Sequence, residues 1–516
     1  MTAAGAAETF AAERHDGIRN LGVYGTALGV AIGASGLAGL VSAVFAAGDD
    51  TIDALVLAGV GTGGVGFAAL LARRPFEARA MRAVPTLTAC VLAYLAVAAI
   101  STVVYLATGS LSRVDDALYE SVTGVATSSL TLFEDPQVLG RGVLVWRAAT
   151  QWIGGLLALG VAIGIYPFLG GSRELADPRA RGFRRLALAN KPIPALKRVV
   201  TMYGVVTVVV AVALLIVGLS VTDAVAHTFS SVSTGGFSTH ADSIAHFDSR
   251  AVDVVMIVVM AGAGFSLALV WMLATGQFQD TLRVYELRVY ALVLALASVW
   301  VWWLADPLDD ATGVVDHGID SVFTVVSLST TTGHRVADWG SWHPGAEMML
   351  LTLLAIGGMA GSVAGGLRWI RVVGLVQFVW RELQRQLHPR TVRAVKVGSS
   401  AISEESIDRW HAHLLFTMFL TGTGAVALAF FGSDILEALT LALSAVSTTG
   451  PALAEDGGTL QSAATLSRSD RAALMPLMLA GRLAITPMLV GVGVVVFGAQ
   501  RRLSAQAFRR RLQGRT

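Results

Sequence analysis

Long apolar segments alternate with short polar connections along most of the chain. Ten of them run for about 17 residues or more, the length that a helix needs to cross a membrane. These predicted spans are 21–47, 52–72, 83–108, 146–170, 199–220, 251–276, 289–305, 346–370, 411–431 and 473–499. Four shorter apolar segments lie between pairs of the later spans, at 116–129, 223–236, 320–333 and 437–450. Because they are too short to cross, they are predicted to be half-helices that enter and leave on the same side.

The four short segments share one pattern. Each begins with an acidic residue and ends thirteen positions later in a cluster of Ser, Thr and Gly. The clusters, called tips below, are Ala126-Thr-Ser-Ser129, Ser233-Thr-Gly-Gly236, Thr330-Thr-Thr-Gly333 and Ser447-Thr-Thr-Gly450. Four repeats that run in the same direction can close a ring around one axis. The predicted fold is therefore an all-α polytopic membrane protein with four parallel helix–pore-loop–helix repeats around one pore, preceded by two extra transmembrane helices.

The distribution of charge predicts the orientation. Arginine-rich connections alternate with acidic ones along the chain, and basic connections stay in the cytoplasm. Both termini are then cytoplasmic, and the half-helices enter from outside. The predicted organisation in chain order is a cytoplasmic N-terminus 1–20, two leading transmembrane helices 21–82, repeat 1 at 83–172, a cytoplasmic connection 173–198, repeat 2 at 199–288, repeat 3 at 289–376, a cytoplasmic connection 377–410, repeat 4 at 411–499 and a basic cytoplasmic tail 500–516.

Composition excludes several other classes of protein. The 516 residues are 54% hydrophobic and only 14% charged, with a mean hydropathy of +0.64, whereas soluble domains carry about 25% charged residues. The single cysteine, Cys90, cannot form an intrachain disulfide. The run Gly61-Thr-Gly-Gly-Val-Gly66 fits a dinucleotide-binding pattern, but it lies inside a predicted span, which favours helix packing. With no Walker A loop, H-E-x-x-H or zinc-spaced cysteine set, neither enzyme activity nor a nucleic-acid partner is expected.

The tips carry the predicted ion chemistry. Irregular backbone at membrane depth is tolerated only where it is buried in protein or lines a water-filled path. Glycine permits backbone angles that turn successive carbonyls toward one axis, and such carbonyls replace the hydration shell of K⁺. One tip alone could be an ordinary Gly/Thr turn, but four in matched positions favour a filter. The predicted K⁺-binding residues are Thr127, Ser128, Ser129, Thr234, Gly235, Gly236, Thr331, Thr332, Gly333, Thr448, Thr449 and Gly450.

Further predictions concern the charged residues and the glycines within the apolar segments. The acidic residues that open the half-helices, Asp116, Asp223, Asp320 and Glu437, are predicted to be N-caps, with direct ion binding as the alternative. Five glycines between 357 and 366 are predicted to break a span, with small-residue helix packing as the alternative. Arg482 lies inside the last span and is predicted to face a cavity, or else to pair with a carboxylate. Arg368 and Arg371 are predicted to be anchors at the membrane interface.

Several motifs resemble one family. Ser233-Thr-Gly-Gly-Phe-Ser-Thr-His240 and Ser329-Thr-Thr-Thr-Gly333 are similar to the second and third filter loops of Trk-type potassium-uptake membrane subunits, the TrkH/KtrB/HKT superfamily. Gln151-Trp-Ile-Gly-Gly155, Gly357-Gly-Met-Ala-Gly-Ser362 and Gly481-Arg-Leu483 also match patterns of that family. The resemblance runs from about residue 20 to 500.

This resemblance implies a homodimer in the cell membrane with one pore per protomer, surrounded by the lipid bilayer. A cytoplasmic nucleotide-binding regulatory subunit of the RCK/TrkA-like type would gate it. K⁺ would be the transported ion, and no covalently bound cofactor is implied. An intramembrane gate loop would lie below the filter, and Arg482 would face the pore there as an electrostatic barrier. The gate residues implied in this way are Gly357, Gly358, Gly361, Ser362, Gly365, Gly366 and Arg482.

Two positions depart from the family pattern. Ser129-Leu130 stands where potassium-selective bacterial members carry Gly-Ala, and a serine there resembles plant HKT members that admit Na⁺. Because a side chain disfavours positive φ, Ser129 is predicted to displace one row of carbonyls and to weaken discrimination between K⁺ and Na⁺. His334 replaces the usual Phe, and is either a pH-sensitive charge at the outer mouth or a hydrogen-bonded imidazole.

Two further functions compete with channel-like K⁺ uptake. An ion-coupled solute symporter would predict inverted repeats, and the parallel tips count against it. A non-conducting membrane scaffold could dock a cytoplasmic signalling partner through the arginine-rich connections. Uptake of K⁺ through a fourfold carbonyl filter, with Na⁺ permeation because of Ser129, is the favoured prediction.

Overall fold

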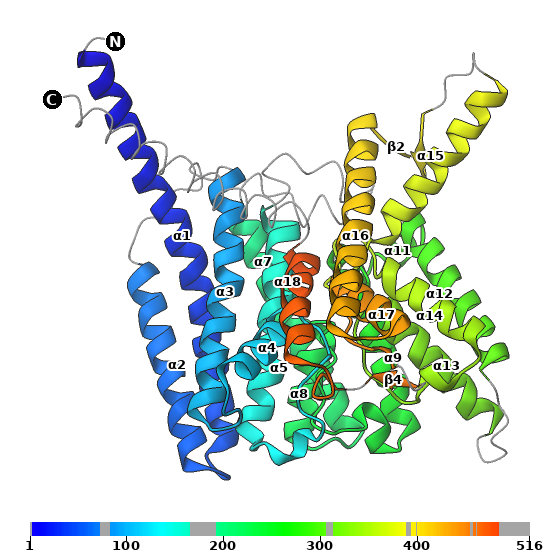
Figure 1. The fold of residues 1–516 in the computed structure, drawn as a ribbon, viewed down its shortest axis with the longest axis horizontal. Helices are drawn as coiled ribbons and strands as arrows, with labels where there is room; N and C mark the ends of the chain where they lie inside the picture. Colours follow the sequence, from blue (N-terminus) through cyan, green and yellow to red (C-terminus); the bar gives the residue numbers. More distant parts are fainter. Residues whose placement is uncertain are drawn as a thin grey trace.

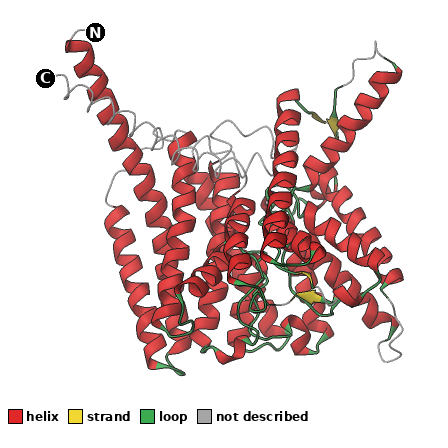
Figure 2. Ribbon diagram, viewed as in Figure 1, coloured by secondary structure: helices red, strands yellow, loops and turns green. Residues whose placement is uncertain are grey.

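The computed structural model describes residues 3–72, 83–165, 192–305, 313–388, 394–398, 400–454, 458–460 and 462–483. Helices dominate this part of the chain, and the only strands in it form two short antiparallel hairpins (Figure 2). One hairpin pairs β1 (Lys396–Val397) with β2 (Ser400–Ala401), and the other pairs β3 (Ala452–Leu453) with β4 (Thr459–Leu460). Seven described helices are long and apolar enough to cross a membrane, and a bent pair makes an eighth.

Two leading helices lie at one side of the molecule (Figure 1). They are α1 (Ala3–Ala46) and α2 (Thr51–Ala72). A Cβ on Gly64 would lie 2.9 Å from the Cα of Gly36, and one on Gly39 would lie 2.8 Å from the carbonyl oxygen of Leu57. Small residues therefore let these two backbones touch, which is the packing role predicted for the glycine run that begins at Gly61.

The rest of the described chain forms four units of helix, short pore helix and helix. They are α3 (Ala83–Ala107), α4 (Val114–Val125) and α5 (Arg141–Leu159); α7 (Pro192–Ile216), α8 (Val221–Val232) and α9 (Arg250–Gly264); α12 (Tyr285–Leu304), α13 (Val314–Ser329) and α14 (Pro344–Ile356); and α16 (Glu404–Phe431), α17 (Ile435–Ser447) and α18 (Arg468–Leu483). The other described helices are the longer α15 (Trp369–Leu387) and several short ones: η2 (Pro136–Val138), the π-turn η3 (Gly160–Ile165), η5 (Ser243–Phe247), α10 (Leu267–Ala274), α11 (Phe278–Leu282) and η6 (Trp339–Ser341).

Two of the predicted spans are interrupted. The span predicted at 346–370 ends at Ile356, and 357–368 is non-helical before α15 begins, as the glycines predicted. The prediction of a single helix across 251–276 was wrong, because the chain bends by 114° between α9 and α10. Apolar composition continues through this corner, so hydropathy carries no signal for it. The remainder of 473–499 after Leu483, the tail 500–516 and most of the connection 173–198 lie outside the described residues.

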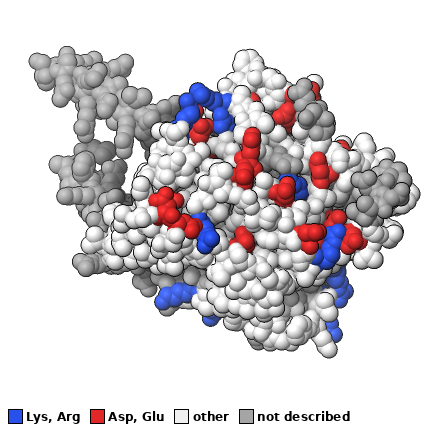
Figure 3. All heavy atoms as spheres, turned by 90° about the horizontal axis from the view of Figure 1, so that it is seen from below, with Lys and Arg blue, Asp and Glu red and all other residues white. Residues whose placement is uncertain are grey.

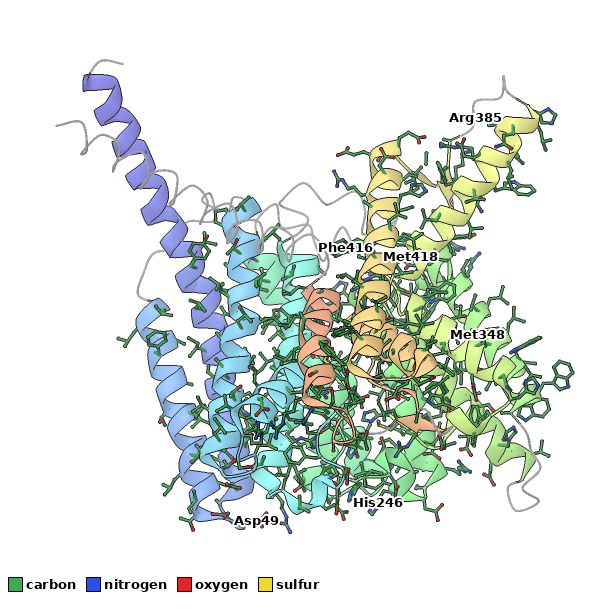
Figure 4. All side chains as sticks on the ribbon, in the orientation of Figure 1. Asp49, His246, Met348, Arg385, Phe416 and Met418 are labelled. Carbon is green, nitrogen blue, oxygen red and sulfur yellow. The ribbon has the colours of Figure 1, made fainter. Side chains whose placement is uncertain are left out.

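Charged side chains lie at both ends of the described part of the molecule. Figure 4 places Asp49 and His246 at one end and Arg385 at the other. The end that carries Asp49 is seen in Figure 3, where both acidic and basic side chains lie in small clusters on a mostly uncharged surface. The sides are apolar, with Leu55 69%, Val208 64% and Phe419 63% exposed. Exposed apolar area on this scale suits contact with lipid.

The core is divided among the junctions between helices of neighbouring units. Met256 and Met260 of α9 are buried in one cluster with Phe323 of the pore helix α13. Leu474 of α18 and Leu441 of the pore helix α17 are buried with Tyr119 of the pore helix α4 in another. Each pore helix is thus supported by apolar contacts, and its C-terminal end is held at the centre of the molecule.

Candidate ion-conduction site

The four tips have the same unusual backbone. Thr127, Thr234, Thr331 and Thr448 have φ angles of 55°, 54°, 56° and 56°. This left-handed conformation costs an L-residue roughly 1–2 kcal/mol, and a β-branched side chain makes it rarer still. Four identical occurrences therefore indicate a conformation that the surrounding structure imposes.

Glycine follows two residues later in three of the tips. Gly236, Gly333 and Gly450 have φ angles of 77°, 80° and 114°. A Cβ on Gly236 would lie 2.0 Å from the carbonyl oxygen of Thr332, and one on Gly333 would lie 2.7 Å from that of Thr449. Neighbouring tips are therefore in backbone contact, and the structure brings the predicted filter residues together.

Several threonine hydroxyls at these tips make no hydrogen bond within the described part of the chain. Thr127, Thr234 and Thr448 are fully buried, and their Oγ1 atoms have no hydrogen-bond partner among the described residues. A buried polar atom left unpaired costs about 1–3 kcal/mol, so such atoms call for a ligand or water. Oxygen atoms that recur in one register around a ring are suited to coordinate a dehydrated monovalent cation.

The first tip departs from the other three at Ser129. Its φ is not positive, whereas the glycines in the same position have positive values. Both the backbone N–H and the hydroxyl of Ser129 donate to the carbonyl oxygen of Thr449, at 3.0 and 2.9 Å. A Cβ on Gly236 would lie 2.8 Å from the Cβ of Ser129, and one on Gly333 would lie 2.5 Å from its Oγ. The Ser129 side chain therefore lies between the other tips.

A cavity of about 390 Å³ opens outward from the tips, with room for several water molecules. Glu134 and Asp338 line it and attract cations. His334 is only 3% exposed and lies 3.0 Å from the hydroxyl of Ser231, so the structure favours the hydrogen-bonded imidazole. Burial lowers the pKa of His240 despite the nearby Asp223 carboxylate, and this imidazole is therefore neutral at pH 7.

The non-helical segment 357–368 lies against the other side of the tips. The Gly365 N–H donates to the Thr331 hydroxyl at 2.8 Å. A Cβ on Gly365 would lie 2.1 Å from the carbonyl oxygen of Ser447 and 2.6 Å from the Thr448 hydroxyl. Only glycine fits this approach, so the segment touches two tips directly.

Buried polar groups hold the segment in place. Glu286, at the start of α12, accepts from the Ala360 N–H at 2.9 Å. The Leu267 N–H donates to the Gly361 carbonyl at 3.0 Å, and it is the bend between α9 and α10 that frees this N–H. The Arg482 guanidinium donates to the Val363 carbonyl at 2.8 Å. Backbone groups that the broken helix leaves unpaired are thereby satisfied.

Comparison with known proteins decides the family. Residues 74–496 match the model of the TrkH family, described as a cation transport protein. The chain belongs to the TrkH family. It is 31% identical over 386 residues to the Trk system potassium uptake protein TrkH of Halomonas elongata, covering 73% of this chain and 78% of that protein. It is 29% identical over 390 residues to the TrkH protein of Escherichia coli K12, with the same coverage.

A solved structure has the same fold. The crystal structure of the potassium transporter TrkH from Vibrio parahaemolyticus matches with a TM-score of 0.79 at 24% identity, covering 91% of this chain and 98% of that one. The predicted fold class and the resemblance to the Trk-type family are therefore confirmed.

In this TrkH-family chain a buried ion pair, missed by the sequence analysis, supports the first tip. The side chains of Glu120 and Arg147 are 0% and 1% exposed, and Arg147 Nε lies 3.1 Å from Glu120 Oε1. The guanidinium also donates to the Thr131 hydroxyl at 2.8 Å, and it lies between the rings of Phe133 and Phe237. The sequence did contain a signal for this pair, because Glu120 lies inside a predicted half-helix and Arg147 inside a predicted span, where ionisable residues are rare unless they are paired.

Two other predictions concern the charged residues Arg368 and Arg482, and the first of them was wrong. Arg368 is not an interfacial anchor, because its guanidinium donates to the carbonyl oxygens of Met359 and Ser362, at 3.1 and 3.3 Å. Arg482 is 7% exposed, and no carboxylate lies within salt-bridge distance of it among the described residues. The carboxylate pair, which was the alternative prediction for Arg482, is therefore not present among the described residues.

The N-cap prediction was also wrong, because the pore helices begin earlier than predicted. Arg113, Ser220, Gly313 and Asp434 occupy the cap positions. The four acidic residues instead lie within the helices, and two of them join neighbouring repeats. These ion pairs are Arg250–Asp320 at 2.5 Å and Arg471–Asp116 at 2.8 Å.

Proposed function

We propose that this chain is a K⁺ uptake subunit in which ions cross a filter made by the four tips. The observation that carries this proposal is the ring of left-handed threonines, three of which have buried hydroxyls with no hydrogen-bond partner in the described part of the chain. The proposed K⁺-binding residues are the twelve predicted for the filter. The relatives that are named potassium uptake proteins support K⁺ as the transported ion.

The electrostatics of the ring suit a cation. Four pore helices end at the tips, and the C-terminal end of a helix carries a partial negative charge. Segment 357–368 is the proposed gate, since it contacts the tips and donates to Thr331. Ions pass only after this segment moves and the hydrogen bond from Gly365 breaks.

The remaining assignments follow from this function. The chain would act in the cell membrane as a homodimer with both termini in the cytoplasm. A cytoplasmic nucleotide-binding subunit would shift the gate. Support comes from the names of the relatives, which are those of Trk system proteins, and from the arginine-bearing end of α15 (Figure 4).

Uptake of ⁸⁶Rb⁺ and ²²Na⁺ into proteoliposomes that hold the purified chain tests the proposal. We expect Rb⁺ uptake that excess K⁺ competes away, together with measurable Na⁺ uptake. Uptake of neither ion, with and without the cytoplasmic partner, would leave the non-conducting scaffold as the better function.

Replacing Ser129 by glycine is expected to raise the Rb⁺/Na⁺ uptake ratio. Glycine allows the positive φ of the other three tips and removes the hydroxyl bound to Thr449. The gain is roughly tenfold, which corresponds to the 1–2 kcal/mol that a Cβ costs in this conformation. Ser129→Ala removes only the hydroxyl, so it should leave the ratio nearly unchanged. An unchanged ratio in Ser129→Gly would contradict the relaxed-filter hypothesis.

Replacing Thr331 by valine is expected to raise Rb⁺ uptake in the absence of the partner by about two- to tenfold, since one hydrogen bond to the gate segment contributes about 0.5–1.5 kcal/mol. The side chain keeps its shape but loses the acceptor for the Gly365 N–H. Thr234→Val is the matched control, because that hydroxyl occupies the same position in another tip and has no described partner. Equal effects of the two substitutions would show that the gate contact is not responsible.

A further inference from the structure

We propose that Gln151 is a positioning residue that sets ion selectivity by tying the first two tips together. This inference rests on the proposed function, because it assigns a role within the same filter. Gln151 lies on α5, one turn after Arg147, and its side chain is fully buried.

One amide reaches both tips. Its Nε2 atom donates to the carbonyl oxygen of Ser128 at 3.0 Å and to that of Gly235 at 2.8 Å. Its Oε1 atom accepts from the N–H of Phe237 at 3.1 Å. The two donor hydrogens of a glutamine amide are therefore both used, each on a different tip.

The amide has only one satisfactory orientation here. A flip would place Oε1 against two carbonyl oxygens and Nε2 against an N–H, so every contact would become repulsive. The amide also packs on the backbone, since a Cβ on Gly235 would lie 2.4 Å from both Cδ and Oε1 of Gln151. Gly235 is thus required for this close contact, and Gly236 for its positive φ.

The two carbonyl groups that Gln151 binds also determine how the adjacent peptide groups of each tip are oriented. Ser128 directly follows Thr127, and Gly235 directly follows Thr234, the two left-handed threonines of these tips. Adjacent peptide planes share φ and ψ angles, so a carbonyl held toward α5 fixes the directions of those before and after it. Without Gln151 the two peptide planes can rotate, and the oxygen positions that select an ion by size and coordination become less defined.

The other repeats lack this device where the structure allows comparison. Gln151 stands three residues before the small pair Gly154-Gly155. In the same way, Met260 stands three residues before Ala263-Gly264, and Met478 stands three residues before Gly481. Both methionines are buried and neither can donate a hydrogen bond. At the junction of the fourth and first tips, Ser129 instead binds the Thr449 carbonyl. The amide is therefore specific to the first two tips.

The test measures ⁸⁶Rb⁺ and ²²Na⁺ uptake by the full-length chain in proteoliposomes with Gln151→Leu and Gln151→Glu. The glutamate variant keeps the shape but cannot donate to both carbonyls, because a carboxylate has no hydrogen to donate and a protonated carboxyl group has only one. We expect both variants to lower the Rb⁺/Na⁺ ratio by about tenfold, the scale of two lost hydrogen bonds, while Rb⁺ uptake persists. Met260→Leu is the matched control and should leave the ratio unchanged.

Each outcome separates the two proposals. If the unaltered chain takes up neither ion, the proposed function fails, and the role of Gln151 fails with it. If the unaltered chain transports Rb⁺ but both Gln151 variants have the same Rb⁺/Na⁺ uptake ratio as that chain, only the role of Gln151 is overturned. An equal fall in Met260→Leu would indicate general packing and also overturn it. Should Gln151→Leu yield no folded protein by size-exclusion chromatography, Gln151→Met, the residue found at position 478, takes its place.

Discussion

Replacing Arg147 by methionine is expected to destabilise the folded chain by about 3–5 kcal/mol, because removing one partner of a buried ion pair leaves the other charge uncompensated. Glu120 would keep its carboxylate in a site with 0% exposure. The guanidinium also fills the space between two phenylalanine rings, and methionine keeps only part of that contact. Thermal unfolding in detergent would measure the loss as a lower midpoint temperature and a smaller monodisperse fraction.

Two controls separate charge from packing. Combining Glu120→Gln with Arg147→Met removes both charges and should recover much of the loss, since neutral replacement of a buried pair is often tolerated. Arg113→Met removes a partner of Asp115 in a pair whose side chains are 45% and 46% exposed, and exposed pairs contribute about 0–1 kcal/mol. A midpoint for Arg147→Met equal to that of the unaltered chain would show that the buried pair does not support the fold.

Replacing Arg482 by alanine is expected to raise Rb⁺ uptake without the cytoplasmic partner by roughly ten- to a hundredfold. The guanidinium donates to the Val363 carbonyl of the gate segment, and a hydrogen bond to a charged group contributes about 1.5–3 kcal/mol. Losing it shifts the closed-to-open equilibrium by a matching factor. On the proposed function, the substitution would also remove a positive charge that repels cations below the filter.

Initial uptake rates at equal protein content in the vesicles would measure this effect. Arg468→Ala is a suitable control, because that arginine lies at the opposite end of α18 and its side chain is 65% exposed. Uptake by Arg482→Ala at or below the level of the unaltered chain would mean that this residue does not hold the segment closed.

Much of the architecture could be predicted because its physical causes are local. Spans follow from the length of apolar segments, and half-helices follow from segments too short to cross. The positive φ angles of Gly236, Gly333 and Gly450 follow from glycine alone. The break after Ile356 likewise follows from five glycines in ten residues.

The features that were missed depend on partners far away in the chain. Propensity argues against a left-handed threonine, and only the recurrence of Thr127, Thr234, Thr331 and Thr448 at one register of the four segments could have indicated it. The bend after Gly264 was missed because hydropathy stays high through it, and because the Leu267 N–H that it frees is satisfied by the distant Gly361 carbonyl. The role of Arg368 depends on a loop whose path hydropathy cannot show.

The left-handed threonines also have a consequence for folding. Each costs roughly 1–2 kcal/mol, and three of their hydroxyls lack described partners, so the tips are a region of stored strain. A cation held by those oxygens would bind the folded chain and not the unfolded one, and its concentration would stabilise the fold by mass action. The ion that such a protein carries would then also act as its folding ligand, and depletion of that ion would loosen the ring before any other part of the molecule.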